Sequence, residues 1–139
     1  MRANSALTGK ATARADYLLL FLRLVSMVLL VFSAGYWAML TGIADNEIRF
    51  DTMSSAWKIA ATSLVVLQPI ASLGLWGGWR WGVVLWILVA AIEGTMYGIY
   101  PGVFGQFTTA LAFHAGTISF YFLAILIVSM RKKKFEADI

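Results

Sequence analysis

Four long apolar stretches follow one another along the chain, separated by short polar or glycine-rich segments. A helix needs about 20 mostly apolar residues to cross the hydrocarbon core of a bilayer, and each stretch is long enough to do so. The pattern therefore predicts an all-α membrane protein, a bundle of four transmembrane helices. The predicted spans are residues 17–40, 56–76, 79–100 and 107–130.

The segments around these spans indicate how the chain is oriented. Most lysines and arginines lie in a polar N-terminal tail (residues 1–15), in the hairpin between the second and third spans, and in a basic C-terminal tail (residues 131–139). With four spans in the domain of residues 16–130, these regions face the same side. Basic residues near span ends stay in the cytoplasm, so both termini are predicted to be cytoplasmic. The run Arg131, Lys132, Lys133 and Lys134 is interpreted as a stop signal, with binding of anionic lipid headgroups as the alternative.

Residues that start or stop helices support these boundaries. Ser54 and Ser55 are candidate N-caps of the second helix, because a serine hydroxyl accepts a hydrogen bond from the first turn. The spans end at Thr41-Gly42, Gly77-Gly78 and Pro101-Gly102. Aromatic residues expected at headgroup depth are Tyr36, Trp37, Trp57, Tyr97, Tyr100 and Phe104 at the outer interface, and Tyr17, Trp76, Trp79 and Trp81 at the inner one.

Composition narrows the class further. The chain of 139 residues is 60% hydrophobic and 13% charged, whereas soluble domains are about 45–50% apolar and about 25% charged. It has no cysteine, which excludes disulfides, a thiolate nucleophile and a cysteine-ligated metal. The net charge of +4 arises beside the spans, where it sets topology, so no nucleic-acid partner is expected.

Two polar residues lie at the same predicted depth in neighbouring spans. Glu93 is seven residues before Tyr100, and His114 is seven residues after Phe107, so each lies roughly 10 Å below the outer boundary. The third and fourth spans are antiparallel and joined by a short loop, which lets the two side chains face each other. A carboxylate and an imidazole at one depth could share a proton and keep the net charge low.

Three interpretations of Glu93 remain open. It is a structural hydrogen-bond partner between helices, a proton-transfer or substrate-coupling acid, or a contact to a partner protein. His114 is the only histidine, so one chain cannot form a bis-histidine haem site, and no His, Asp and Glu cluster predicts a metal site. Tyr97 lies close to Glu93 as a supporting polar group, and no cofactor is expected.

The inner half holds a second possible pair, Arg23 and Gln68, both roughly 10 Å from the inner surface on the same helical rise. The long stem of Arg23 favours snorkelling to the headgroups instead. Pro69 removes a backbone hydrogen bond and frees the carbonyl of Val65. We expect Gln68, Ser72 or water to meet that carbonyl.

Small residues recur every four positions on the third and fourth spans, which predicts close helix packing beside Glu93. Three further glycines, Gly74, Gly78 and Gly82, lie on both sides of the predicted hairpin turn. They are therefore weaker evidence of helix packing than the small-residue rows on the third and fourth spans. The predicted packing residues are Ala90, Gly94 and Gly98 on the third span and Ala112 and Gly116 on the fourth.

Three segments together resemble a known family. They are RLVSMVLLVFSAGYWAMLTGI, the following acidic loop with RFD, and LWGGWRWGVVLWILVAAIEGTMYG continued by YPGVFG. Over about residues 20–125 they are similar to a family of small four-helix bacterial inner-membrane proteins of unknown function. The resemblance implies this fold and location but no activity. A looser likeness, in size and span count, is to DoxX-type membrane proteins, some of which are linked to quinone-dependent oxidation.

Two functional hypotheses follow for a protein of the bacterial inner membrane. The first is a non-enzymatic accessory or scaffold subunit of a larger membrane assembly, with lipid and other membrane subunits or a second copy as partners. It is motivated by the small mass outside the spans and by the lack of G-x-S-x-G and H-E-x-x-H motifs. The alternative is a small proton-coupled carrier or quinone-binding module that uses Glu93 and His114. A lipid or envelope-stress sensor is a third option.

Overall fold

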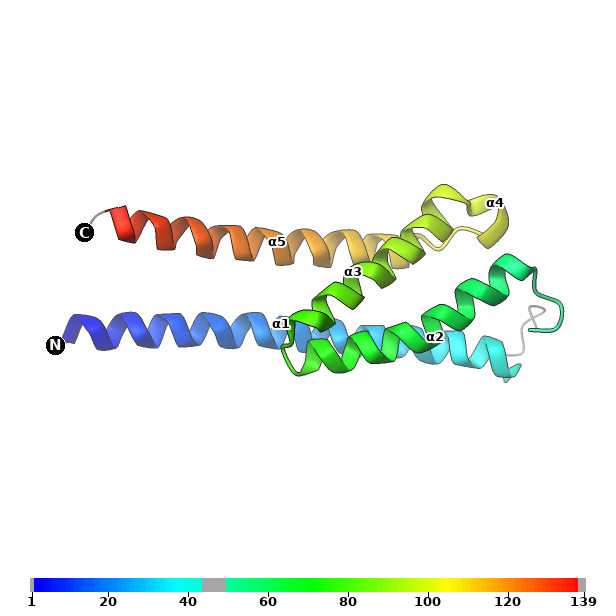
Figure 1. Ribbon diagram of the computed structural model, residues 1–139, viewed down its shortest axis with the longest axis horizontal. Helices are drawn as coiled ribbons and strands as arrows, with labels where there is room; N and C mark the ends of the chain where they lie inside the picture. The colour runs from blue at the N-terminus through cyan, green and yellow to red at the C-terminus, as the bar shows by residue number, and fades with distance from the viewer. Residues whose placement is uncertain (1, 44–49, 138–139) are drawn as a thin grey trace. The chain divides into compact units, whose positions relative to one another are not determined.

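The computed structural model describes the backbone of residues 2–43 and 50–137, and the side chains of residues 16–43 and 50–130. These parts of the chain are built from helices joined by short turns, with no strand among them. The elements, shown in Figure 1, are α1 (Arg2–Thr41), α2 (Ser55–Trp76), α3 (Arg80–Gly94), the π-helix η1 (Thr95–Ile99), α4 (Pro101–Phe104) and α5 (Thr108–Ala137).

Four helical segments are long and apolar enough to cross a membrane, which confirms the all-α class with four candidate spans. They are Asp16–Thr41, Ser55–Trp76, Arg80–Ile99 and Thr108–Met130. The helix α1 begins at Arg2, so the backbone of the polar N-terminal region is helical, whereas the sequence predicted a tail preceding a helix at residue 17. The physical reason is composition: this region is rich in alanine with lysine and arginine, which are good helix formers.

The chain divides into two compact units, Met1–Ile92 and Glu93–Ile139. In the first unit, α1 and α2 run antiparallel and side by side (Figure 1). The buried positions of α1 recur at helical spacing and form one apolar stripe against α2. The buried residues of this helix pair include Leu22, Val25 and Leu29 on α1, and Ala61, Leu64, Val65, Ala71 and Leu75 on α2.

Serine hydroxyl groups fix both ends of α2. At its start, Ser54 accepts a hydrogen bond from the backbone N–H of Trp57 at 3.3 Å, which confirms the predicted N-cap. Near its end, the Ser72 hydroxyl donates to the carbonyl of Ser26 on α1 at 2.6 Å. Of the three groups expected to meet the carbonyl freed by Pro69, namely Gln68, Ser72 or water, Ser72 is therefore not the one, because its hydroxyl bonds the neighbouring helix.

Two helices approach closely at the hairpin between α2 and α3. A Cβ atom on Gly82 would clash with the carbonyl carbon of Gly74 and would lie 2.5 Å from the nitrogen of Leu75. Gly78 has a φ of +69°, which favours glycine, and the turn brings Gly74 and Gly82 opposite each other. The expectation that these glycines are weak evidence of helix packing is therefore wrong. Only residues without a Cβ fit where the two helices of the hairpin approach each other.

The second unit begins with the last two residues of α3, Glu93 and Gly94, and continues through η1, which ends before Pro101. The short helix α4 and a turn at Gly105, with a φ of +79°, then lead to α5. The ring of Tyr97 in η1 meets the ring of Phe107 edge-on, with centroids 5.6 Å apart. This contact lies within the turn region that connects Glu93 to the helix carrying His114.

Candidate functional site

Glu93 lies on the last turn of α3, where the helix changes from α to π geometry. The N–H of Tyr100 donates to the carbonyl of Thr95 at 3.1 Å, a bond to the fifth residue back instead of the fourth. Pro101 has no N–H, so it cannot continue the helical ladder, and the helix ends there. Short π-helical segments of this kind occur frequently at functional sites. No pattern of residues predicted this π-helical segment.

The side chains of Glu93 and His114 are in direct contact. His114 Nε2 lies 2.5 Å from Glu93 Oε2, so the two side chains are joined by a short hydrogen bond. Glu93 is fully buried and His114 is 4% exposed. The contact that equal depth predicted is therefore present, and it lies inside the second unit.

The geometry restricts where protons can lie in this pair. If one proton lies on the Nε2–Oε2 line and the pair is neutral overall, Nδ1 carries a hydrogen whichever partner holds the shared proton. If the pair carries a charge of −1 with that proton in place, Nδ1 has only a lone pair. In the part of the chain that the structure describes, buried Nδ1 has no hydrogen-bond partner. The pair therefore has one polar atom available for a further contact.

Tyr97 and Tyr36, both expected at headgroup depth, have side chains that are buried in the protein. Tyr97 is 7% exposed and Tyr36 is 6% exposed. Other aromatic residues expected there are at least partly exposed, including Trp37, Tyr100, Trp76, Trp79 and Trp81.

The small-residue row beside Glu93 does not make the expected close packing. A Cβ on Gly94 or on Gly116 would meet nothing within 4 Å among the described residues. A Cβ on Gly98 would make only an ordinary contact, with a methyl carbon of Leu111 at 4.0 Å. Ala90 is half-buried and Ala112 is exposed. Spacing alone predicted these positions, and it does not show which face of a helix meets a neighbour.

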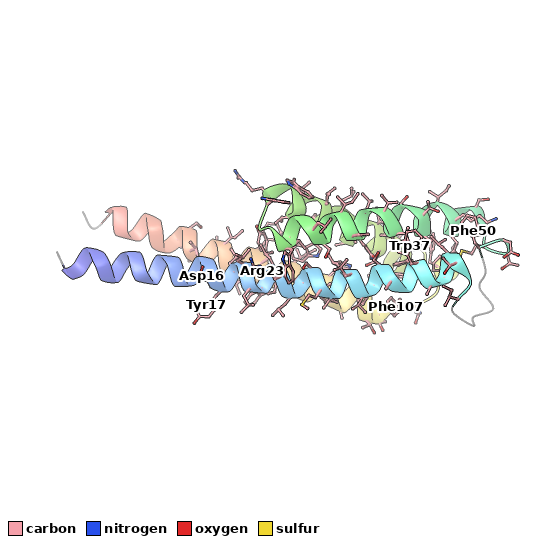
Figure 2. The ribbon with its side chains drawn as sticks, turned by 90° about the horizontal axis from the view of Figure 1, so that it is seen from below. Asp16, Tyr17, Arg23, Trp37, Phe50 and Phe107 are labelled. Atoms are coloured by element: carbon pink, nitrogen blue, oxygen red, sulfur yellow. The ribbon has the colours of Figure 1, made fainter. Side chains whose placement is uncertain are left out.

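Arg23 and Gln68 do not form the pair considered from the sequence. The Nε–H of Arg23 donates to the carbonyl of Trp76 at 3.4 Å, and its guanidinium carbon lies 5.5 Å from the centroid of the Trp76 ring. Arg23 is exposed, whereas Gln68 is fully buried. Figure 2 shows Arg23 on α1 near the α2–α3 hairpin, with Asp16 and Tyr17 on the part of α1 that extends past it. Arg23 thus lies level with the end of α2.

Two further expectations concern other residues of the chain. The side chains of Arg131, Lys132, Lys133 and Lys134, expected to meet headgroups or stop the fourth span, lie outside the described residues. Among those that are described, no group of three or more His, Asp or Glu side chains could hold a metal ion.

These features define a class: an all-helical protein with four candidate membrane-spanning helices and a buried glutamate–histidine pair. The chain belongs to a family of unknown function, DUF6163, whose model matches residues 16–132. This match confirms the resemblance to a family of unknown function, while a likeness to DoxX-type proteins is not shown. No curated protein and no solved structure matches the chain.

Proposed function

We propose that this chain is a four-span integral protein of a bacterial inner membrane, with both termini in the cytoplasm. Four helices of sufficient length and apolarity support the insertion. The concentration of lysine and arginine in both tails and at the α2–α3 hairpin supports the orientation. In this placement, Glu93 and His114 lie within the hydrocarbon layer.

Within that membrane, we propose that the chain is a small proton-coupled carrier without enzymatic activity, and that Glu93 and His114 are its proton-binding site. The observation that carries this proposal is the 2.5 Å contact between two buried titratable groups. Ionisable groups inside a membrane are costly and mark proton or substrate pathways. A carboxyl–imidazole pair can gain or lose one proton while its net charge changes by a single unit, between 0 and −1.

Two details favour proton binding over a purely structural bridge. A structural pair in an apolar interior is most stable when all of its polar atoms are bonded, whereas buried Nδ1 of His114 has no partner among the described residues. The adjacent π-helical turn, η1, replaces the regular α-helical bonds next to Glu93. Such a turn is a natural place for a local change in helix geometry.

The test is difference infrared spectroscopy of the purified protein in lipid vesicles while pH is changed. The proposal expects a protonated-carboxyl band that gains or loses intensity with pH and disappears in Glu93→Gln. Thr117→Val is the matched control, because the Thr117 hydroxyl on α5 bonds only carbonyls of its own helix, at 2.6 and 3.4 Å. A carboxyl that keeps one protonation state across about pH 5 to 8, where an imidazole ordinarily titrates, would contradict proton coupling.

The quinone-binding form of this hypothesis uses the same atoms. A neutral pair presents Nδ1–H as a donor, and a quinone carbonyl is an acceptor of the required kind. Added quinone should then shift the imidazole bands of wild type, and His114→Asn, which has no imidazole, should show no spectral response to quinone. Equal spectra with and without quinone would leave proton coupling alone as the proposal for this site.

A second candidate function is an accessory subunit of a larger membrane assembly. The observation that favours it is the small-residue face of α5, where Gly116 has open space at its Cβ position and Ala112 is exposed. Such a face permits close approach of another helix. Purification in mild detergent should then yield a stoichiometric partner that Gly116→Leu releases. Recovery of the lone chain from wild type would contradict this role.

A further inference from the structure

The end of the α2–α3 hairpin gathers arginine and tryptophan side chains. Trp76 ends α2, Trp79 lies immediately before α3, and Arg80 begins α3. Arg23 reaches this end from α1. We call Arg23, Trp76, Trp79, Arg80 and Trp81 the hairpin cluster. The three indole rings are 48%, 54% and 45% exposed in that order, so this end presents aromatic surface that the first unit does not cover.

The guanidinium of Arg23 is held in place by the protein and is still accessible. Its Nε–H donates to the Trp76 carbonyl, and one face lies over the Trp76 ring. An arginine has five N–H donors. For the other four, on the two Nη atoms, no acceptor is found in the described part of the chain. The side chain is therefore fixed by two contacts while most of its donors remain available.

Hydrogen bonds and close packing around Arg23 stabilise this end of the first unit. The hydroxyl of Ser26, three residues from Arg23, donates to the Arg23 carbonyl at 2.8 Å, and Ser72 bonds the Ser26 carbonyl. The close approach of Gly74 and Gly82 packs the two helices of the hairpin against each other. The rings of Trp79 and Trp81 stack, with their centroids 5.5 Å apart. The cluster is thus a built surface on three helices.

Within the described residues, no ion pair joins Arg23 or Arg80 to a carboxylate. The nearest acid along α1 is Asp16, seven residues from Arg23, which is roughly 10 Å along a helix. Among the described residues, the two arginines of the cluster therefore have no carboxylate that neutralises them.

We propose that the hairpin cluster binds the phosphate of an anionic phospholipid. The paired Nη–H groups of an arginine match two oxygens of a phosphodiester in a fork geometry. Exposed indoles are favoured at headgroup depth, where their rings meet the acyl-chain boundary and their N–H groups meet polar groups. Arg80 adds a second positive charge at the same hairpin end. This inference rests on the membrane placement proposed above but not on the Glu93–His114 pair.

Lys58 provides a matched control within the same helix pair. Its ammonium lies 5.4 Å from the centroid of the Phe50 ring and donates to the Asp51 carbonyl at 3.4 Å, so it repeats the cation–ring and carbonyl contacts of Arg23. It lies at the start of α2, the opposite end from Trp76, beside an acidic residue. A general effect of removing any cation would appear equally in Lys58→Gln.

The experiment is native mass spectrometry of the full chain in detergent with added phosphatidylglycerol or phosphatidylcholine. Wild type should retain phosphatidylglycerol at least tenfold more strongly than phosphatidylcholine. Arg23→Gln should remove most of this preference, Arg23→Lys should keep part of it, and Lys58→Gln and Glu93→Gln should keep all of it. Inorganic phosphate in millimolar excess should not displace the lipid, because it supplies the anion without the acyl chains. Circular dichroism checks that each variant remains helical.

Equal lipid preference in Arg23→Gln and wild type would overturn the proposal, as would an equal loss in Lys58→Gln. Displacement by inorganic phosphate would show a simple anion site and would also overturn the assignment to lipid. If Arg23→Gln does not fold, Arg80→Gln decides, since the exposed Arg80 side chain makes no hydrogen bond, ion pair or ring contact among the described residues. It should lower phosphatidylglycerol retention severalfold, and unchanged retention would reject the site. An unchanged preference in Glu93→Gln separates this outcome from failure of the proton-coupling proposal.

Discussion

At the residue scale, Glu93 and His114 form a pair in which each partner makes the burial of the other possible. A carboxylate or imidazolium alone in an apolar interior is costly, whereas a bonded pair with little net charge is tolerated. The contact at 2.5 Å between two groups that are at least 96% buried meets that condition. Removing one partner should therefore lower the free energy of unfolding more than replacing it by a neutral group that keeps a hydrogen bond.

The first prediction compares three variants by their free energy of unfolding in lipid or mixed micelles. Glu93→Ala should lower it by about 1–3 kcal/mol, because Nε2 of His114 then loses its carboxyl partner in a buried site. Glu93→Gln keeps a hydrogen-bonding side chain and should lose less, about 0.6 kcal/mol, the typical value for an interhelical polar contact in a membrane. Thr117→Val should stay close to wild type. Equal stability of Glu93→Ala and wild type would show that the pair does not support the fold.

At this scale, the contact between Glu93 and His114 could be predicted from the sequence, whereas the hydrogen-bond partner of Arg23 could not. Glu93 and His114 could be matched because each depth is counted from a nearby helix end, over only seven residues. The partner of Arg23 depends on where α2 ends and on which way its last carbonyls point. Arg23 bonds the backbone carbonyl of Trp76. Because every residue has such a carbonyl, the pattern of residue types does not indicate which one accepts the bond.

At the element scale, the α2–α3 hairpin depends on an approach that only glycine permits. The second prediction is that Gly82→Ala lowers the free energy of unfolding by about 1–3 kcal/mol, as overpacking does, because its Cβ would meet the backbone of Gly74. Thermal or denaturant unfolding monitored by circular dichroism measures this loss.

Gly35→Ala is the control for that substitution. A Cβ on Gly35, which lies within α1, would meet nothing within 4 Å. Alanine is about 1 kcal/mol more favourable than glycine inside a helix, so this variant should be as stable as wild type or more stable. Equal destabilisation of both variants would mean that the hairpin approach is not specific.

The third prediction concerns the hydrogen bond that joins α1 to α2. Ser72→Ala leaves the buried Ser26 carbonyl without the Ser72 hydroxyl that bonds it at 2.6 Å. The loss should be about 0.6 kcal/mol and at most about 1.7 kcal/mol, the range measured for such bonds between membrane helices. Ser63→Ala is the control, since the Ser63 hydroxyl bonds the carbonyl of Ile59 in its own helix at 2.8 Å. A larger loss in Ser63→Ala than in Ser72→Ala would contradict this account.

The existence of the four long helices could be predicted from the sequence. The local geometry of these helices, and where they approach each other closely, could not. Length and apolar content were sufficient for four candidate spans, and the N-cap at Ser54 followed from its side chain. The π-helix at Thr95–Ile99 was missed because glycine, tyrosine and a following proline are equally compatible with an α-helical end. The Gly74–Gly82 approach was missed because the two glycines become neighbours only after the chain has turned at Gly78.

At the scale of the whole molecule, the proposals rest on insertion into a membrane with both termini in the cytoplasm. The fourth prediction uses the absence of cysteine, which lets a single introduced cysteine report its own position. In intact cells, a membrane-impermeant maleimide should label Gln106→Cys, at the exposed turn before α5, and should not label Lys10→Cys until the cells are opened. The reverse pattern would invert the orientation, and labelling of both before lysis would exclude the proposed topology.

The central claim is that Glu93 and His114 share a proton within the membrane, and a single histidine makes it directly measurable. Protein labelled with ¹⁵N only at histidine contains one imidazole, so its two nitrogen resonances report Nδ1 and Nε2 of His114 alone. In lipid, across about pH 5 to 8, wild type should show Nε2 in a strong hydrogen bond to a carboxyl group and a change of state that moves with the Glu93 infrared band. Both features should be lost in Glu93→Gln and kept in Thr117→Val. Identical resonances in wild type and Glu93→Gln, unchanged at every pH, would contradict the account.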